Sequence, residues 1–222
     1  MVLKAAAAPL ADAASPAPDL PFDRSRTLLA ASTHEGEEEA VLDAFAALLP
    51  DHPGLRLILA PRHPRRRDQI EPLIAVRGLA FATRSRGDAP GPQQPVYLAD
   101  TLGEMALWYR AAGLCFVGGS LAPRGGHTPF EPAAAGSVIL HGPSVENFAA
   151  PYQALERAGA ALAVTGPADL TRALAPLIGD GAGQTRLADA ARAALSAFRG
   201  QTDEEEFLAA LARTTGLVIR AE

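Results

Sequence analysis

The sequence predicts an α/β fold built on a Rossmann-like, doubly wound and mostly parallel sheet, and three observations predict it. Apolar runs of four to six residues recur along the chain, for example at residues 28–31, 55–60 and 114–117. Segments with the apolar period of an amphipathic helix separate these runs. Turns rich in glycine and proline mark the boundaries. Such alternation is typical of a parallel sheet that helices cover on both faces.

The first half of the chain supplies strands and helices in turn. The expected strands cover residues 28–31, 55–60, 79–83 and 96–99, and the expected helices cover residues 37–49, about 65–77 and 101–112. Pro72 lies inside the second of these helices and predicts a kink there. Residues 84–95 are rich in arginine, glycine, proline and glutamine, so we expect a surface loop.

The second half continues the alternation. The expected strands cover residues 114–117, 138–140 and 160–164, and the expected helices begin near residue 128 and cover 148–158, 169–178, 183–198 and 203–213. Residues 1–23 are rich in alanine, proline and aspartate without periodicity, which predicts a linker. We therefore expect one domain, residues 24–222, preceded by an interdomain segment.

Composition excludes several classes of function. The chain has 222 residues, 48% of them hydrophobic, and a net charge of −5, which argues against nucleic acid as the main partner. It has a single cysteine, Cys115, so no disulfide can form within the chain. No apolar run approaches the roughly 18 residues that span a bilayer. Neither a GxxxxGK[ST] motif nor a GxGxxG after the first strand occurs, which argues against ATP-driven chemistry and a dinucleotide site.

The most informative segment follows the strand at 114–117. Two glycine pairs, at 118–119 and 125–126, precede a predicted helix start at 128–132. Glycine allows close approach of the backbone, and free N–H groups at a helix start favour an anion such as phosphate. Glu131, in the first turn, can accept hydrogen bonds from ribose hydroxyls. The segment therefore predicts a nucleotide-sugar site.

Three other loops follow strands and are predicted to converge on the same sheet edge. In the loop at 32–38, a helix cap with Ser32 or Thr33 as N-cap is the favoured explanation of the acidic residues, so Ser32, Thr33 and His34 are the better candidates for ligand contact. A metal site at His34 and Glu35 has little support. In the loop at 61–67, Arg62 suits a phosphate, whereas residues 65–67 suit a solvated helix face. In the loop at 100–105, Thr101 can cap a helix, and a capping box with Glu104 explains much of the pattern.

Taken together and in order, these motifs resemble the C-terminal half of the bacterial 3-deoxy-D-manno-octulosonic acid (Kdo) transferases. The matching stretches are AASTHEGEEEAV (30–41), LILAPRHPRR (57–66), DTLGEM (100–105), FVGGSLAPRGGHTPFEPAAAG (116–136) and GPSVENF (142–148). The resemblance implies a GT-B glycosyltransferase, with two Rossmann-like domains and an active site in the cleft between them. It also implies transfer of Kdo from CMP-Kdo to the lipid A precursor in lipopolysaccharide assembly.

The resemblance further implies that this domain holds the CMP part of the donor, with no metal and no cofactor, since CMP-Kdo is a substrate. The implied CMP contacts are Pro61, Arg62, Gly103, Glu104, Met105, Thr128, Pro129, Phe130 and Glu131. The candidate contacts to the rest of the donor are Ser32, Thr33, His34, Gly118, Gly119, Ser120, Gly125, Gly126, His127 and Asn147. Asn147 is explained equally by capping of the next helix. Thr128 and Ser144 depart from the asparagine and histidine usual in the family, which weakens their expected donor contacts.

The family's N-terminal domain carries its membrane anchor, its acceptor site and the glutamate that acts as general base. None of these is in the 222 residues, so we expect the chain alone to be soluble, to bind CMP weakly and to transfer nothing. The resemblance places the parent enzyme at the cytoplasmic face of the bacterial inner membrane, with the lipid A precursor bound through the other domain. The alternatives are another GT-B nucleotide-sugar enzyme, such as an epimerase, and a non-catalytic binding module.

Overall fold

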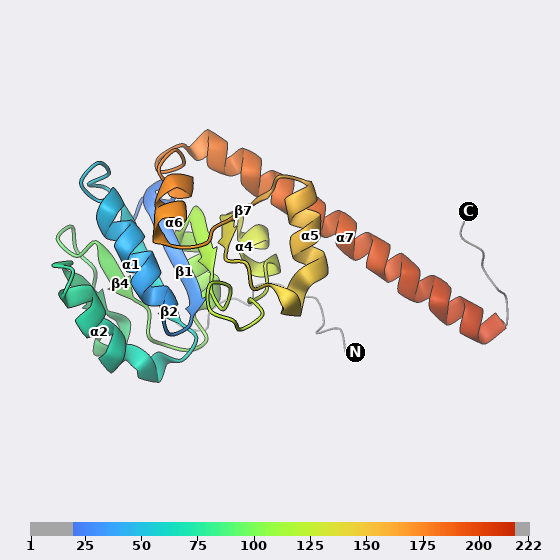
Figure 1. The fold of residues 1–222 in the computed structure, drawn as a ribbon, viewed down its shortest axis with the longest axis horizontal. Helices are drawn as coiled ribbons and strands as arrows, with labels where there is room; N and C mark the ends of the chain where they lie inside the picture. The colour runs from blue at the N-terminus through green and yellow to red at the C-terminus, as the bar shows by residue number, and fades with distance from the viewer. Residues whose placement is uncertain (1–19, 216–222) are drawn as a thin grey trace.

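A seven-stranded, all-parallel sheet forms the centre of the domain (Figure 1). The computed structural model describes residues 20–215, with side chains through residue 200. The strand order is β3-β4-β2-β1-β5-β6-β7. The strands are β1 Thr27–Thr33, β2 Arg56–Pro61, β3 Phe81–Thr83, β4 Val96–Leu98, β5 Leu114–Val117, β6 Val138–His141 and β7 Ala161–Ala163. The predicted doubly wound parallel sheet is confirmed.

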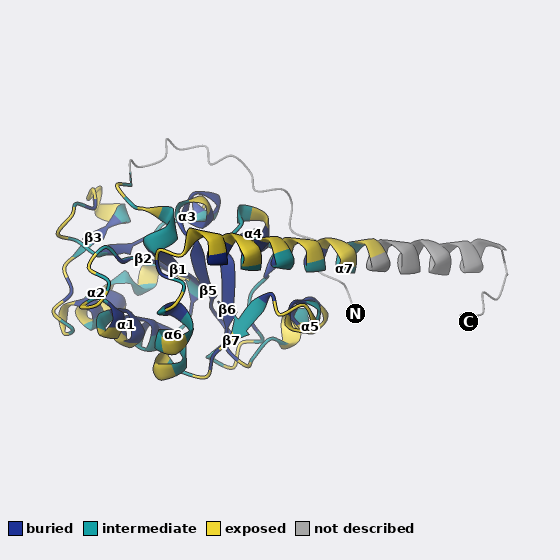
Figure 2. Cartoon of the chain, turned by 90° about the horizontal axis from the view of Figure 1, so that it is seen from above, coloured by how far each residue is buried: buried dark blue, intermediate teal, exposed yellow. Residues whose placement is uncertain are grey.

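Helices cover both faces of this sheet. The α-helices are α1 Glu37–Leu48, α2 Arg67–Ala75, α3 Met105–Ala111, α4 Phe130–Ala135, α5 Ala149–Arg157, α6 Pro167–Leu174 and α7 Gly181–Thr215. Four 3-10 turns, η1 Arg24–Arg26, η2 Pro64–Arg66, η3 Arg84–Arg86 and η4 Glu146–Phe148, lie in the connections. Figure 2 shows α1, α2 and α6 on one side of the sheet and α3, α4 and α7 on the other.

The two faces arise from the alternation of side chains along each strand. In β1, Leu28 and Ala30 join the core under α1, α2 and α6. Leu29 and Ala31 point the opposite way and join the core under α3, α4, α5 and α7. Because both faces are covered, the central strands are mostly apolar and are buried over most of their length.

Two helix boundaries differ from the prediction. The structure has one helix, α7, where the sequence suggested two helices at 183–198 and 203–213. A lone Gly200 costs a helix only about 1 kcal/mol and no proline follows it, so nothing in the sequence stops the helix there. Helix α3 begins at Met105 rather than at Thr101, because Gly103 adopts a φ of 83° and keeps the preceding segment in a turn.

The ends of the predicted domain are only partly covered by the structure. Of the predicted linker at 1–23, residues 1–19 lie outside the described residues, whereas Leu20 and Phe22 pack against the core under α3. Within residues 20–215, no helix has both the length and the hydropathy required to cross a membrane.

The connections place a functional edge at the middle of the sheet. On one side of β1 lie β2, β4 and β3, in that order outward, whereas β5, β6 and β7 lie on the other side. The direction of the strand order therefore changes between β1 and β5. Ligands of doubly wound sheets bind at the carboxyl ends of the strands beside such a switch point. The loops after β1 and β5 are the ones that meet there.

Candidate functional site

The glycine loop after β5 is held by a carboxylate of the protein itself. Glu37, at the start of α1, is 1% exposed. Its two oxygens accept four loop N–H groups at 2.7–3.3 Å, from Gly119, Ser120, Leu121 and Ala122. It also accepts the N–H of His34 at 2.9 Å. The expectation that these amides are free for a phosphate is not met, because Glu37 already supplies the anion.

The other candidate residues of this loop are also used internally. Gly118 donates its N–H to the carbonyl of Ala31 at 2.8 Å. The hydroxyl of Ser120 donates to the carbonyl of Val117 at 2.5 Å and accepts the N–H of Gly142 at 2.8 Å. These bonds join the ends of β1, β5 and β6. Gly118, Gly119 and Ser120 therefore use these groups to shape the edge of the sheet.

A second buried carboxylate, Glu38, binds the loop after β2. Its side chain is fully buried and pairs with Arg66 at 2.5 Å. It also accepts the Thr33 hydroxyl at 2.8 Å. Burial raises the pKa of Glu38, and the bonds from Arg66 and Thr33 oppose that rise. The prediction that Arg66 lies on a solvated helix face was wrong. Gly36, and not Ser32 or Thr33, is the N-cap residue of α1. Glu37 and Glu38 lie in the first turn of α1, as the capping interpretation expects, and both are also buried ligands of neighbouring loops.

Three histidines meet between the ends of β1, β2 and β5. The Nε2 atoms of His34 and His127 are 3.0 Å apart, and their rings stack with centroids 5.2 Å apart and planes at 6°. The ring of His63 approaches His34 edge-on, at 6.0 Å between centroids. The pKa of His34 is lowered chiefly by burial and further by Arg124, His63 and Arg66, whereas Glu37 raises it. Sequence reasoning selected His34 and His127 but missed their direct contact.

The loop after β2 presents Arg62 directly at the end of the strand. Pro61 is buried at the end of β2, and the N–H of Arg62 donates to the carbonyl of Thr33 at 3.0 Å. The guanidinium of Arg62 is exposed, and within the described residues no hydrogen bond or ion pair engages it. Arg62 is thus a cation at this edge that is available to a phosphate.

The segment before α3 is built around Glu104, whose side chain is 9% exposed. Its carboxylate pairs with Arg84 at 2.7 Å and accepts the Thr101 hydroxyl. Arg84 lowers the pKa of Glu104. Glu104, and not Thr101, occupies the N-cap position of α3, so the predicted cap was wrong. Gly103 is exposed and Met105 half-buried, so main-chain groups of this turn remain accessible while the Glu104 carboxylate does not.

The turn before α4 contrasts with these satisfied carboxylates. Pro129 is the N-cap residue, and the Thr128 hydroxyl accepts the N–H of Phe130 at 3.3 Å. Glu131 lies in the first turn as predicted and is half-buried. No hydrogen bond or ion pair joins its carboxylate to another described residue, and burial raises its pKa. Glu131 can therefore accept hydrogen bonds from a ligand.

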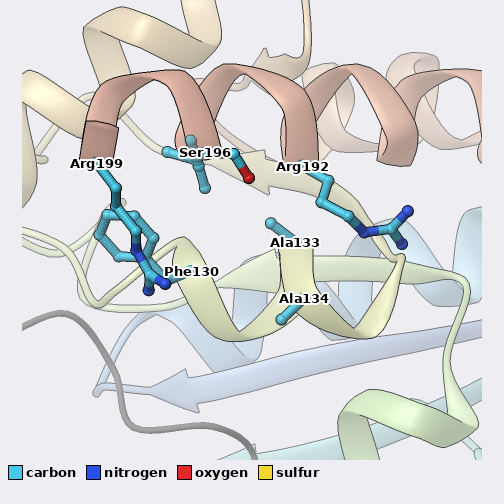
Figure 3. Close-up of a pocket in the computed structure, with 7 residues that line it drawn as sticks. Phe130, Ala133, Ala134, Arg192, Ser196 and Arg199 are labelled. Atoms are coloured by element: carbon cyan, nitrogen blue, oxygen red, sulfur yellow. The ribbon is translucent and has the colours of Figure 1, made fainter. Parts of the chain in front are cut away.

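The ring of Phe130 does not face the sheet edge. It lines a shallow pocket between α4 and α7 (Figure 3), with Ala133, Ala134, Arg192, Leu195, Ser196 and Arg199. The guanidinium carbon of Arg199 lies 4.5 Å from its centroid. Phe130 can therefore contact a ligand at the strand ends through its main chain.

Asn147 does not cap the next helix, because the N-cap residue of α5 is Phe148. Its side-chain amide donates to the carbonyl of Arg124 at 2.8 Å and to that of Gly126 at 3.4 Å. A Cβ on Gly125 would lie 2.5 Å from that amide nitrogen, and Gly125 has a φ of 78°. The Ser144 hydroxyl accepts the Gly125 N–H at 2.9 Å. The second glycine pair thus lets the loop fold closely under the segment after β6.

No group of three or more histidine, cysteine, aspartate or glutamate side chains in the described part of the chain is arranged to hold a metal ion. Two residues that sequence reasoning did not select shape the site. They are Glu37, which binds the glycine loop, and Arg84, which binds Glu104. Their partners are distant in sequence, so local patterns carried no signal for these contacts.

Comparison with known proteins identifies the family. No family model matches the chain. A 3-deoxy-D-manno-octulosonic acid transferase from Haemophilus influenzae is 37% identical over 173 residues, which are 78% of this chain and 40% of the relative. The enzyme of that name from Bordetella pertussis is 38% identical over 176 residues, 78% of this chain and 41% of the relative. The chain thus spans about 40% of the length of these relatives.

A solved structure of a single domain aligns with this chain over nearly the whole length of that domain. The crystal structure of the C-terminal CMP-Kdo binding domain of WaaA from Acinetobacter baumannii superposes with a TM-score of 0.73 and 31% identity. The match covers 78% of this chain and 90% of that domain. The chain belongs to the 3-deoxy-D-manno-octulosonic acid transferase family, in which it corresponds to the C-terminal domain of a GT-B glycosyltransferase.

Proposed function

We propose that this chain binds CMP-Kdo and is the donor-binding half of an enzyme that transfers Kdo to a lipid A precursor. The observation that carries the proposal is a pair of unengaged charged groups at the switch-point edge. Within the described residues, Arg62 has an unengaged guanidinium in one loop, and Glu131 begins α4 with an unengaged carboxylate. A guanidinium binds phosphate through charge-assisted hydrogen bonds, and a carboxylate accepts from the two ribose hydroxyls. One nucleotide can use both.

In this arrangement the remaining CMP contacts come from main-chain groups. Gly103, Glu104 and Met105 form the turn before α3, where the Arg84 pair fixes the backbone. Thr128, Pro129 and Phe130 form the turn before α4. The side chains of Glu104 and Phe130 are engaged elsewhere, so we assign these two residues to the site through their backbones.

The transfer reaction itself is proposed for the longer protein. Attack of an acceptor hydroxyl requires a base to take its proton while CMP departs. The groups at the strand ends here can bind and stabilise the departing phosphate. We therefore propose that the 222 residues alone bind CMP without transferring Kdo, and that the longer protein acts on a lipid A precursor at the cytoplasmic face of the inner membrane.

Isothermal titration of the chain with CMP and with UDP tests the proposal. We expect CMP to bind more tightly. Arg62→Ala and Glu131→Ala should each weaken CMP binding by about tenfold or more, because each removes charge-assisted hydrogen bonds of roughly 1.5–3 kcal/mol. Arg65→Ala is the matched control, since Arg65 is an arginine of the same loop that lies outside the proposed contacts, and it should change the affinity by less than about twofold. Tighter binding of UDP, or unchanged CMP binding in both variants, would overturn the proposal.

A further inference from the structure

The histidine pair, His34 and His127, lies between the two segments that we assign to CMP. His63, whose ring contacts His34 edge-on, directly follows Arg62. His127 directly precedes Thr128 and the turn that ends in Glu131. The imidazole of His34 therefore touches one neighbour from each nucleotide-binding segment. The pair lies beside the expected phosphate, between the carboxyl ends of β1 and β5.

Both rings of the histidine pair are positioned by fixed backbone. The N–H of His34 donates to the buried Glu37 carboxylate at 2.9 Å. The N–H of His127 donates to the Gly118 carbonyl at 3.2 Å, and its carbonyl accepts the Tyr152 hydroxyl at 3.0 Å. A Cβ on Gly119 would lie 3.1 Å from the His127 ring. The glycine thus makes room for that ring, and the pair is held in place before any ligand arrives.

The charges around the histidine pair favour an anion. Arg124, His63 and Arg66 face His34 and disfavour its cationic form, whereas Glu37 favours it. Glu37 is bound by four loop amides and Glu38 by Arg66, so both nearby carboxylates are already compensated. Two Nε2 atoms at 3.0 Å share a single proton, because two protonated nitrogens at that distance would repel each other. An anion that lies beside both Nε2 atoms removes this restriction by accepting from both.

We propose that the histidine pair is the subsite for the carboxylate of the donor sugar. The inference rests on the proposed function. In a nucleotide-linked 2-ulosonic acid such as Kdo, the carboxylate is attached to the same anomeric carbon as the phosphate oxygen. A phosphate on Arg62 therefore brings the carboxylate to the adjacent anion site. Binding there draws a proton into the pair, and the two imidazoles then donate one charge-assisted hydrogen bond each.

The test compares CMP with CMP-Kdo on the intact chain by isothermal titration. The wild type should bind CMP-Kdo about tenfold or more tighter than CMP, since two charge-assisted bonds are added. His34→Gln and His127→Gln should abolish this preference while leaving the affinity for CMP within about twofold. His52→Gln is the control, because His52 lies in the turn before β2, at the opposite edge of the sheet. Titration in buffers of different ionisation enthalpy should show about one more proton taken up with CMP-Kdo than with CMP near neutral pH.

The outcomes separate this inference from the function on which it rests. If the wild type binds no CMP, the proposed function fails and the subsite with it. If CMP binds but the variants keep the full preference for CMP-Kdo, the carboxylate subsite is wrong. It is also wrong if both ligands weaken equally, which would assign the histidine pair to the phosphate. Equal proton uptake for the two ligands would contradict the claim that the histidine pair takes up a proton when the carboxylate binds. Where CMP affinity is retained, it shows that the variant is folded. Where both ligands weaken, an unchanged midpoint of urea denaturation shows it.

Discussion

The glycine loop at 118–122 and the turn at 128–131 are neighbours in sequence and space, yet the carboxylates associated with them differ in their hydrogen bonding. In the loop, Glu37 is buried and accepts four backbone N–H groups. In the turn, Glu131 is half-buried and accepts no hydrogen bond from the described residues. Burial raises the pKa of Glu131 because nothing in that part of the chain compensates its charge. One carboxylate joins distant segments of the fold, and the other has no hydrogen-bond partner among the described residues, which is why we propose it for the ligand.

The contrast shows how to interpret glycine-rich loops after parallel strands. Such a loop offers N–H groups to an anion, but the protein can supply that anion from a helix far away in sequence. An unsatisfied, partly buried polar group is better evidence for binding, because it lowers stability unless something else compensates. Glu104, bound by Arg84 and Thr101, is a third carboxylate at the edge and resembles Glu37 rather than Glu131.

The largest effect is expected from Glu37→Ala. It removes the acceptor of four loop amides and of the His34 N–H. Leaving buried N–H groups without a partner should lower the free energy of unfolding by about 3–5 kcal/mol. Urea denaturation measures this effect, with an unchanged m-value confirming that the unfolding transition is comparable. Glu35→Ala is the control, since Glu35 is exposed, and a loss below about 1 kcal/mol for Glu37→Ala would break the comparison.

Glu131→Gln should weaken CMP binding without lowering the free energy of unfolding. The amide keeps the size of the side chain but loses the charge, so CMP binding should weaken by about tenfold. The free energy of unfolding at neutral pH should stay the same or rise, because an uncompensated charge has been removed from a half-buried position. Titration calorimetry and urea denaturation of the same samples measure both quantities. A clear loss of stability in this variant would mean that Glu131 has a structural partner.

The pH dependence gives an independent check on Glu131. Its pKa in the folded domain is raised above 4.5, so the folded state binds the proton more tightly than the unfolded state does. The stability associated with this group is therefore present below pH 4.5 and is lost as the pH rises through the raised pKa. CMP affinity should rise over the same interval, because the ionised carboxylate is the better acceptor. Both trends should disappear in Glu131→Gln.

An intermediate effect is expected from Arg84→Met. The side chain of Arg84 is 24% exposed and that of Glu104 is 9% exposed, so removal of the arginine should lower the free energy of unfolding by about 1–2 kcal/mol. CMP affinity should fall by a few-fold at most, because the turn before α3 loses the ion pair that holds Glu104 but keeps its backbone donors. Arg86→Met is the control, since the side chain of Arg86 is 53% exposed in its pair with Glu71. If the two variants lose equal free energy of unfolding, Glu104 does not stabilise the fold in the way that Glu37 does.

The sequence predicted the sheet and the strand-end loops, because these depend on local patterns. Periodicity places Val41 and Phe45 on the buried face of α1, and position after a strand selects Arg62. The structure adds contacts between distant segments, such as Glu37 with the glycine loop and Asn147 with Gly126. No local pattern encodes such contacts. For the same reason the capping interpretation of Glu104 failed, since its partner Arg84 is 20 residues away.

The smallest effect is expected from Gly119→Ala, which tests whether the glycine loop exists to place His127. A methyl group at this position would lie 3.1 Å from the His127 ring, and the backbone has a φ of 69°. Gly87 is the matched control, because its φ of 77° is similar but a methyl group added there would meet no atom within 4 Å. Gly87→Ala should lower the free energy of unfolding by about 1 kcal/mol from backbone strain alone. Gly119→Ala should cost somewhat more, and only this variant should shift the NMR signals of the His127 ring. Equal costs and an unmoved ring would mean that Gly119 serves the backbone turn and not the histidine.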